Sequence, residues 1–321
     1  MPPLFKHSNL QAMESSNIFL LFSSLLSLLI FPSPPTAAAQ LSQNYYSSIC
    51  PNVESLVHAA VAHKLQLSFA AAPGTLRLFF HDCFVRRSRP DAVAGGGGHR
   101  NRAKAAVDGD PQCTNKVSCA DILAIAARDV VSLTGGPYYQ VELGRLDGRV
   151  TSKANVKHNL PGPGYNLDQL NAVFAANGLT QTDMIALSGA HTIGVTHCDK
   201  FIRRIYRFKQ PLAFNPPMNL TFLRQMRQIC PLNYNPSTFA MLDPATPFKF
   251  DNAYYQNLQK EMGLLASDQI LFTDQRSRGL VNWFASNQTA FEEAFVAAMT
   301  KLGGSGLRMR PKERFGGSAP P

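Results

Sequence analysis

After about residue 40, apolar residues recur along the chain at the spacing of helices that bury one face. The clearest case is Ser118–Leu133, which opens on a serine that can cap a helix and is followed by Gly135-Gly136-Pro137. The same spacing predicts further helices over Leu56–Phe69, Leu76–Val85, Leu167–Asn177, Thr182–Leu187, Ile202–Phe208, Leu220–Ile229, Ala253–Glu261 and Ala290–Lys301. Short extended segments are predicted at Tyr139–Leu143 and Ile270–Phe272, and no repeat period is found. The pattern indicates a predominantly α fold.

Three segments interrupt this pattern. Pro73-Gly74 is expected to separate the first two helices. Arg86–Lys104 and Gly303–Pro321 are basic, rich in glycine and without periodicity, so we expect coil in both. Their composition suggests misread exon boundaries or a shifted reading frame, a hypothesis that sequencing the transcript across both stretches would test.

The amino terminus has the layout of a secretory signal peptide. Lys6 and His7 precede the apolar stretch Ile18–Phe31, and a run of small residues ends at Ala39. We therefore expect residues 1–39 to be a signal peptide that is removed, with Met13 as an alternative start. The apolar stretch is short and broken by serines, so a retained membrane anchor is the less favoured alternative and the mature chain is expected to have no membrane segment.

Composition allows a sizeable core and gives the chain a basic surface. Apolar residues make up 45% of the sequence, and 31 Lys and Arg against 21 Asp and Glu give a net charge of +10. This excess favours anionic partners, which could be nucleic acid, an acidic membrane or acidic polysaccharide. The densest basic run contains Arg203, Arg204, Arg207 and Lys209, and a solvated helix face explains it better than a nucleic-acid site.

All six cysteines follow residue 40, so disulfides are expected in a secreted protein: Cys50, Cys83, Cys113, Cys119, Cys198 and Cys230. Two glycosylation sequons, Asn219-Leu-Thr221 and Asn287-Gln-Thr289, fit the same route.

Arg77 and His81 are the first residues that point to chemistry. They are four positions apart and so project from one face of an apolar helix, with Phe80 beside them. Placing a cation and an imidazole on such a face is costly unless they act on something there. Taken alone, the pair could also be purely structural, with His81 hydrogen-bonded to a backbone carbonyl and Arg77 extending to solvent.

His191 is the second such residue, in the glycine-bounded turn Ser188–Gly194. A neutral imidazole held this way can ligate a metal or a haem iron if its other nitrogen has an acceptor. A structural histidine is one alternative. A zinc site with His197 and Cys198 is another, although the sequence has no pair of cysteines at zinc-ligand spacing.

In combination, Ala72–Phe84 and Ala186–Gly194 resemble the distal and proximal haem motifs of plant class III secretory peroxidases. The resemblance runs from Gln40 to about Leu302 and extends to Tyr46–Asn52, Val117–Leu123, Gly144–Gly148 and Phe250–Tyr255. It implies a mainly α, two-lobed fold with haem b between distal and proximal helical halves. The domain would cover 40–302, with 86–103 as a non-family insert and 303–321 as a divergent tail.

The resemblance also implies a role for each haem-site residue. His191 would be the proximal iron ligand, and Asp268 would accept the other imidazole N–H. His81 would take a proton from hydrogen peroxide and return it to the leaving oxygen, and Arg77 would stabilise the negative charge that develops there. Phe80 would screen the distal pocket.

The implied function is the oxidation of phenolic small molecules by hydrogen peroxide, through a ferryl form of the haem. Pro161 matches the family's residue at the edge where donors enter, although a simple turn is the alternative. The family further implies a monomer secreted to the cell wall, with the vacuole as the less favoured destination.

The resemblance implies one calcium ion on the proximal side. Its ligands would be the side chains of Thr192, Asp243, Thr246 and Asp251 and the carbonyl of Lys249. The distal calcium site keeps only Asp82 and the Val85 carbonyl, so we expect that site to be lost.

The family pattern fails at two further places. It implies the disulfides Cys50–Cys113 and Cys198–Cys230 but leaves Cys83 and Cys119 without their family partners. Each lost bridge costs about 2–5 kcal/mol of stability. The family's asparagine that would accept from the second nitrogen of His81 also has no counterpart.

Two alternatives to an active peroxidase remain open at this stage. The first is a haem-binding protein with little turnover, because the distal calcium and hydrogen-bond network is broken. The second is a basic cell-wall adhesin that keeps the fold but binds no haem.

Overall fold

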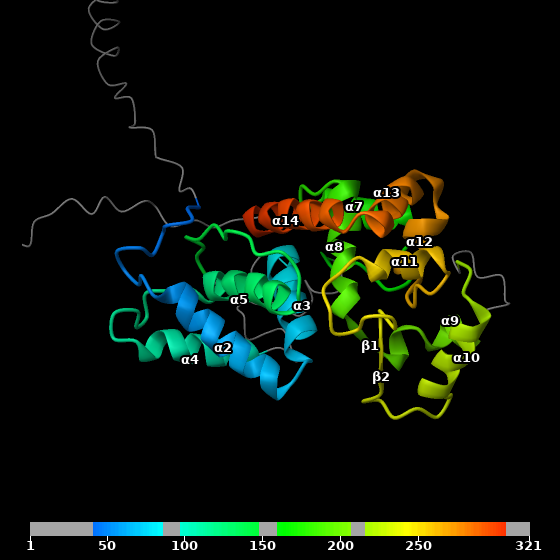
Figure 1. Cartoon of the computed structure of the whole chain (residues 1–321), viewed down its shortest axis with the longest axis horizontal. Coiled ribbons are helices and arrows are strands. Elements are labelled where there is room, and N and C mark those ends of the chain that lie inside the picture. Colours follow the sequence, from blue (N-terminus) through cyan, green and yellow to red (C-terminus); the bar gives the residue numbers. More distant parts are fainter. Residues whose placement is uncertain (1–40, 86–96, 148–158, 207–215, 306–321) are drawn as a thin grey trace, which may run out of the picture. The chain divides into compact units, whose positions relative to one another are not determined.

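The computed structural model describes residues 41–85, 97–147, 159–206 and 216–305 and is mainly helical over these ranges (Figure 1), which confirms the predicted fold class. The elements are α2 (Val53–Leu67), α3 (Ala71–Phe84), α4 (Gly97–Gly109), α5 (Cys119–Leu133), α7 (Leu167–Ala175), α8 (Gln181–Ser188), η3 (Gly189–Ile193), β1 (Val195–His197), η4 (Cys198–Lys200), α9 (Ile202–Tyr206), α10 (Leu220–Ile229), β2 (Phe239–Met241), α11 (Ala253–Gln259), α12 (Ala266–Thr273), α13 (Gln275–Ser286) and α14 (Gln288–Gly304). The predicted signal peptide lies outside the described residues. Of the helices within them, none combines the length and the hydropathy that a membrane crossing requires.

The described residues form two sets of helices that meet at α3. In the first set, α2 packs on α4 and α5, and α3 packs on α5. In the second set, α8 packs on α14, and α13 packs on both α11 and α12. Helix α3 also contacts η3 and α14, so the first set faces the second along this helix. This arrangement agrees with the predicted distal and proximal halves.

Polar caps fix where the helices around the site begin. The Ser118 hydroxyl accepts a hydrogen bond from the Asp121 backbone N–H at 3.2 Å and starts α5, as the sequence predicted. Thr180 and Asp183 form a capping box that starts α8. Because α8 runs directly into η3, this cap also sets the position of His191.

Both predicted disulfides, Cys50–Cys113 and Cys198–Cys230, are present in the structure. Cys83 and Cys119 remain thiols. The second disulfide joins η4 to the end of α10, beside the antiparallel pair β1 and β2. Sequence reasoning missed these strands, because three residues are too few for a pattern of alternation.

The prediction that Pro73-Gly74 interrupts the chain as a helix breaker was wrong. Helix α3 begins earlier, at Ala71, and includes both residues. Pro73 lies in the first turn, where backbone N–H groups have no partner within the helix, so the missing N–H of proline costs little there.

The coil predicted for Arg86–Lys104 was wrong at its carboxyl end, because α4 begins at Gly97. Ala103 and Val107 lie one turn apart and are both buried, which gives this helix an apolar face. The coil predicted from Gly303 was also too early, because α14 continues to Gly304. Residues 86–96 and 306–321 lie outside the described residues.

Of the two predicted extended segments, Ile270–Phe272 was wrong. Ile270–Phe272 lies in α12, where packing against α11 and α13 outweighs the strand preference of its residues. Of Tyr139–Leu143, only Leu143 pairs as a strand does, in an isolated bridge with Ser42. Helix α13 was not predicted at all.

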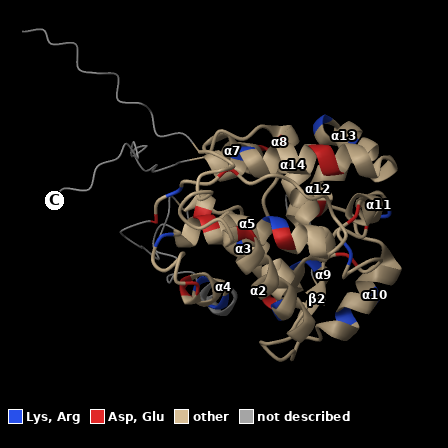
Figure 2. Cartoon of the chain, turned by 60° about the vertical axis from the view of Figure 1, so that its left-hand side comes forward, with Lys and Arg blue, Asp and Glu red and all other residues tan. Residues whose placement is uncertain are grey.

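Charged residues are scattered over many helices in the view of Figure 2. Of the basic run, Arg207 and Lys209 lie outside the described residues, and its described part does not form one solvated face. Arg203 is exposed, but Arg204 is buried and donates to the carbonyls of Pro216 and Leu264 at 2.7 and 3.2 Å. The prediction of a solvated face was therefore wrong for Arg204.

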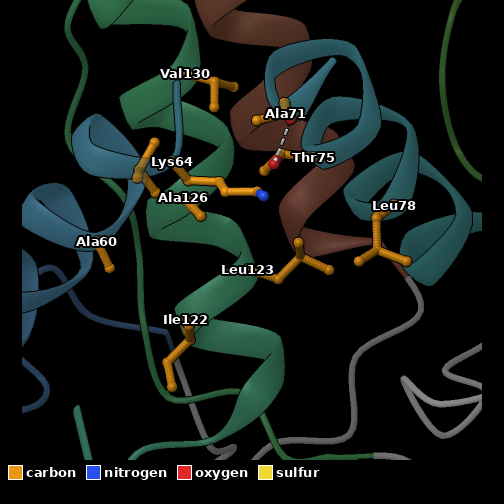
Figure 3. A pocket seen from close by; sticks show the side chains of 10 residues that line it. Ala60, Lys64, Ala71, Thr75, Leu78, Ile122, Leu123, Ala126 and Val130 are labelled. Atoms are coloured by element: carbon orange, nitrogen blue, oxygen red, sulfur yellow. Dashed lines mark hydrogen bonds between the residues drawn. The ribbon is translucent and has the colours of Figure 1, made fainter. Parts of the chain in front are cut away.

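A small apolar pocket lies between α2, α3 and α5 (Figure 3). The Lys64 amine points into it, and the Thr75 hydroxyl in its wall donates to the Ala71 carbonyl at 2.8 Å. None of the predicted site residues lines this pocket.

Candidate functional site

Helix α3 buries one face and leaves the predicted distal residues on the other. Its buried residues include Leu76, Leu78 and Phe79, whereas Arg77 is exposed and His81 is half-buried. Phe80 is also half-buried and stacks on Phe84, with ring centroids 4.0 Å apart. The helix therefore leaves the side chains of Arg77, Phe80 and His81 at least partly accessible, outside its buried face.

His81 is held as a neutral imidazole. Burial lowers its pKa to about 4, and the positive charge of Arg77 contributes in the same direction. Its Nδ1 atom is buried and has no hydrogen-bond partner among the described residues. The acceptor whose loss the sequence predicted is thus not replaced within this part of the chain.

The turn that carries His191 is packed too tightly for any residue but glycine at its start. A Cβ atom on Gly189 would lie 2.4 Å from the Phe291 ring and 2.6 Å from the Tyr255 hydroxyl. This close approach fixes η3 against α11 and α14. His191, two residues later, is consequently presented from a constrained backbone.

His191 Nδ1 lies 2.8 Å from Asp268 Oδ1, in α12. Asp268 is only 2% exposed, and the Tyr254 hydroxyl donates to the same oxygen at 3.0 Å. Burial lowers the pKa of His191, but the carboxylate charge and hydrogen bond outweigh it, so the pKa is raised overall. A carboxylate partner places the imidazole proton on Nδ1 and leaves the Nε2 lone pair available. The imidazole therefore fits the role of an iron ligand.

Arg77 connects the two histidines electrostatically. Its charge contributes to the lowered pKa of His81 on its own helix, and it opposes the rise in the pKa of His191 on η3. Helix α3 packs against η3, so the fold brings together the residues predicted for the two sides of the haem. A carboxylate-bound imidazole on one segment and an arginine–histidine pair on the other fit the predicted cofactor.

The predicted calcium ligands converge at one place. Thr192 Oγ1 lies 3.0 Å from Asp243 Oδ2, 3.4 Å from the Lys249 carbonyl and 3.4 Å from Asp251 Oδ1. Thr246 Oγ1 lies 3.2 Å from Asp243 Oδ2 and 3.0 Å from Asp251 Oδ1. Each hydroxyl has one proton and can satisfy only one acceptor at a time. A cluster of oxygens with too few protons fits a hard cation such as calcium.

The remaining predicted residues lie around these sites. Asp82 is half-buried near the end of α3, and Val85 is the residue at which that helix ends. Pro161 is half-buried in the loop before α7. In the same loop, the Pro163 carbonyl accepts from the Ser267 backbone N–H at 3.1 Å, which ties the loop to α12 beside Asp268.

The zinc alternative does not fit the structure. Cys198 is bonded to Cys230 and offers no thiolate, and His197 Nδ1 lies 3.3 Å from the Thr238 carbonyl. The described residues contain no group of three or more histidine, cysteine or acidic side chains that could hold a metal.

Sequence reasoning missed three residues that support the site. The Tyr254 hydroxyl donates a hydrogen bond to Asp268, and Asn257 Nδ2 donates one to Asp243 Oδ1 at 2.7 Å. The charge of Asp268 also acts on buried Arg204, where it opposes the lowering of the pKa by burial. Tyr254 lies in a motif that the resemblance covered, so that motif was the available signal. The partners of the other two became apparent only in the folded chain.

Comparisons with known proteins agree with this geometry. The family model for peroxidases matches residues 57–287. Peroxidase 16 of Arabidopsis thaliana is 53% identical over 303 residues, which cover 89% of this chain and 94% of that protein. Peroxidase 45 of the same plant is 50% identical over 311 residues, covering 92% and 95% of the two chains. The chain therefore belongs to the peroxidase family, as the resemblance to its plant class III members implied.

Proposed function

We propose that this peroxidase binds haem b through His191 and uses hydrogen peroxide to oxidise phenolic small molecules outside the cell. The observation that carries the proposal is the 2.8 Å pair between His191 Nδ1 and buried Asp268, on the segment that packs against α3 with Arg77 and His81. When bound, the haem supplies an iron that can be oxidised by peroxide and reduced again by donors.

On the proximal side, Asp268 would keep His191 in one tautomer and one orientation. Accepting the N–H makes the imidazole a stronger electron donor through Nε2. The Tyr254 hydroxyl holds the carboxylate in place from the other side, at 3.0 Å.

On the distal side, His81 would move the proton. Because its pKa is lowered to about 4, the imidazole is neutral at ordinary pH and can accept a proton from hydrogen peroxide. The same atom would return that proton to the departing oxygen. Arg77 would stabilise the negative charge on this oxygen, and Phe80 would limit access to the pocket.

Donor molecules would approach beside Pro161. The hydrogen bond from Ser267 to the Pro163 carbonyl supports this placement, because it holds the loop next to Asp268 and hence near the haem ligand. Small phenols fit such an edge, since each gives one electron and one proton, and nothing needs to be transferred to the ring.

Secretion is supported by the two disulfides, which form and persist in oxidising compartments. The sequence of residues 1–39 fits a signal peptide, and the cell wall is the proposed destination in preference to the vacuole. The net charge of +10 would favour contact with acidic polysaccharide there, and we propose that the chain acts as a monomer.

The proposal is tested by a spectrum of the protein reconstituted with haem. We expect a Soret band, and a rapid shift of that band on mixing with hydrogen peroxide, followed by its return when guaiacol is added. The orphaned Nδ1 atom of His81 favours one second candidate, a haem-binding protein with little turnover. For that candidate the Soret band would not shift, and for an adhesin without haem no Soret band would form at all.

We further propose one calcium ion on the proximal side, held by Thr192, Asp243, Thr246, Asp251 and the Lys249 carbonyl. The converging oxygens with too few protons support this site. Asp82 and Val85 are insufficient for a second ion, so metal analysis should find one calcium per chain.

Chelating calcium should lower the melting temperature of the protein. With free calcium at a hundredfold excess over its dissociation constant, the ion adds about 2.7 kcal/mol, a shift of roughly 5–10 °C. Thermal melts followed by circular dichroism, with and without chelator, measure this. The Thr246→Val variant should have the same melting temperature with and without chelator. The exposed control Asp199→Asn should show the wild-type difference between the two melts. If the chelator leaves the wild-type melting temperature unchanged, the proposed calcium site is wrong.

A further inference from the structure

The only tryptophan of the chain, Trp283, is exposed on α13. Its side chain is 55% exposed, whereas Phe284 beside it is fully buried. One turn earlier on the same face lies Gly279, and a Cβ atom there would meet nothing within 4 Å. The surface next to the indole is therefore open to another molecule.

From this indole, a series of aromatic rings leads to the proposed iron ligand. Trp283 and Phe284 have ring centroids 6.0 Å apart, and Phe284 and Tyr255 are 5.3 Å apart. Tyr255 and Tyr254 follow at 5.0 Å, and Tyr254 lies 6.0 Å from the His191 ring. The series crosses from α13 to α11, which pack against each other (Figure 1).

The members of this series have the chemistry for moving single electrons. Tryptophan and tyrosine are among the side chains most readily oxidised by one electron, and phenylalanine can bridge two of them. When Tyr254 loses an electron, its phenol proton has an acceptor, because its hydroxyl donates to Asp268 at 3.0 Å. The Tyr255 hydroxyl donates to the Ile185 carbonyl at 2.8 Å, so this ring keeps its proton and serves as a relay.

We propose that Trp283 is a second oxidation site, used by phenolic polymers that are too large to approach the haem edge at Pro161. A phenolic unit of the polymer would stack on the exposed indole and be oxidised there. The inference rests on the proposed function, because the oxidising power comes from the peroxide-treated haem at His191.

The electrons balance over one cycle. Reducing one hydrogen peroxide to two waters takes two electrons and two protons. Each electron would leave Trp283 through the ring series toward His191 and be replaced by one electron from a phenolic hydroxyl. That hydroxyl also releases its proton and becomes a phenoxyl radical, so the protein is unchanged.

The competing explanation is that these rings only fill the core, as Phe284, Tyr254 and Tyr255 are all buried. Conservative substitutions separate the two explanations. Trp283→Phe and Tyr255→Phe keep an aromatic ring at each position but remove the side chain that is easily oxidised.

The first experiment locates the radical by mass, independently of turnover. Haem-reconstituted protein is treated with one equivalent of peroxide and a nitroso spin trap, without donor, and digested with trypsin. The peptide Gly279–Lys301 contains Trp283 but no tyrosine or cysteine, so an adduct in it reports the indole. We expect this adduct in wild type, its loss in Trp283→Phe and a marked decrease in Tyr255→Phe. A wild-type peptide without adduct would overturn the proposal.

The second experiment compares a soluble guaiacyl dehydrogenation polymer with guaiacol as donors. In Trp283→Phe, kcat/KM for the polymer should fall by about tenfold or more, while that for guaiacol stays within about twofold. The control Tyr138→Phe alters another exposed aromatic residue and should change neither. Equal effects on both donors, or none on the polymer, would overturn the second site. A wild type that forms the haem complex but does not oxidise guaiacol would instead contradict the proposed function.

Discussion

Replacing His191 by alanine should abolish the Soret band of the reconstituted protein and its consumption of hydrogen peroxide. The substitution removes the imidazole that pairs with Asp268 and leaves that buried carboxylate without its main partner. Without Nε2, the proposed haem iron would lose the protein ligand that we assign to the proximal side. Haem titration followed at the Soret maximum, together with peroxide consumption, measures both effects.

His197→Ala is the matched control for this experiment. His197 lies six residues later and is exposed, and its side chain lies beside the Thr238 carbonyl and the Phe239 ring. This variant should bind haem and consume peroxide as wild type does. Unchanged haem binding and turnover in His191→Ala would show that the iron ligand has been assigned wrongly.

Replacing His81 by leucine should leave the Soret band in place but slow the reaction with peroxide by about 10²–10⁴-fold, the usual contribution of a positioned acid–base group. The rate constant is measured by stopped-flow mixing across a range of pH. In wild type it should decrease as the pH falls through about 4, because the imidazole becomes protonated and can no longer accept a proton. The variant should show no such decrease.

His63→Leu provides the control, since His63 is exposed on α2, outside the haem site. It should retain both the wild-type rate constant and its dependence on pH. If His81→Leu reacts with peroxide at the wild-type rate, the distal role belongs to another group, and the orphaned Nδ1 atom would then indicate a merely structural histidine.

The sequence predicted those helices whose apolar spacing and capping residue both lie within one short segment of the chain. Leu220–Ile229 was predicted with both ends correct, because its amphipathic face begins just after Asn219, whose side chain caps the helix. The start of α5 at Ser118 was predicted for the same reason. The strands β1 and β2 have no such local signal, since each exists only by pairing with a segment about forty residues away.

The candidate site divides in the same way. Arg77 and His81 could be paired from their spacing, because one helix carries both. His191 and Asp268 are 77 positions apart, and only the resemblance to a family joined them in advance. The oxygens around Thr192 were likewise assigned by resemblance, and the folded chain places them 3.0–3.4 Å from the Thr192 hydroxyl.

The adjacency of His191 and Thr192 on the five-residue segment η3 makes the two proposed metals thermodynamically dependent on each other. An ion that orders Thr192 also orders the neighbouring imidazole, so it reduces the entropy that haem binding has to remove. By linkage, haem must then tighten calcium binding by the same factor by which calcium tightens haem binding. Removing the proposed calcium ion should therefore weaken haem binding by that same factor.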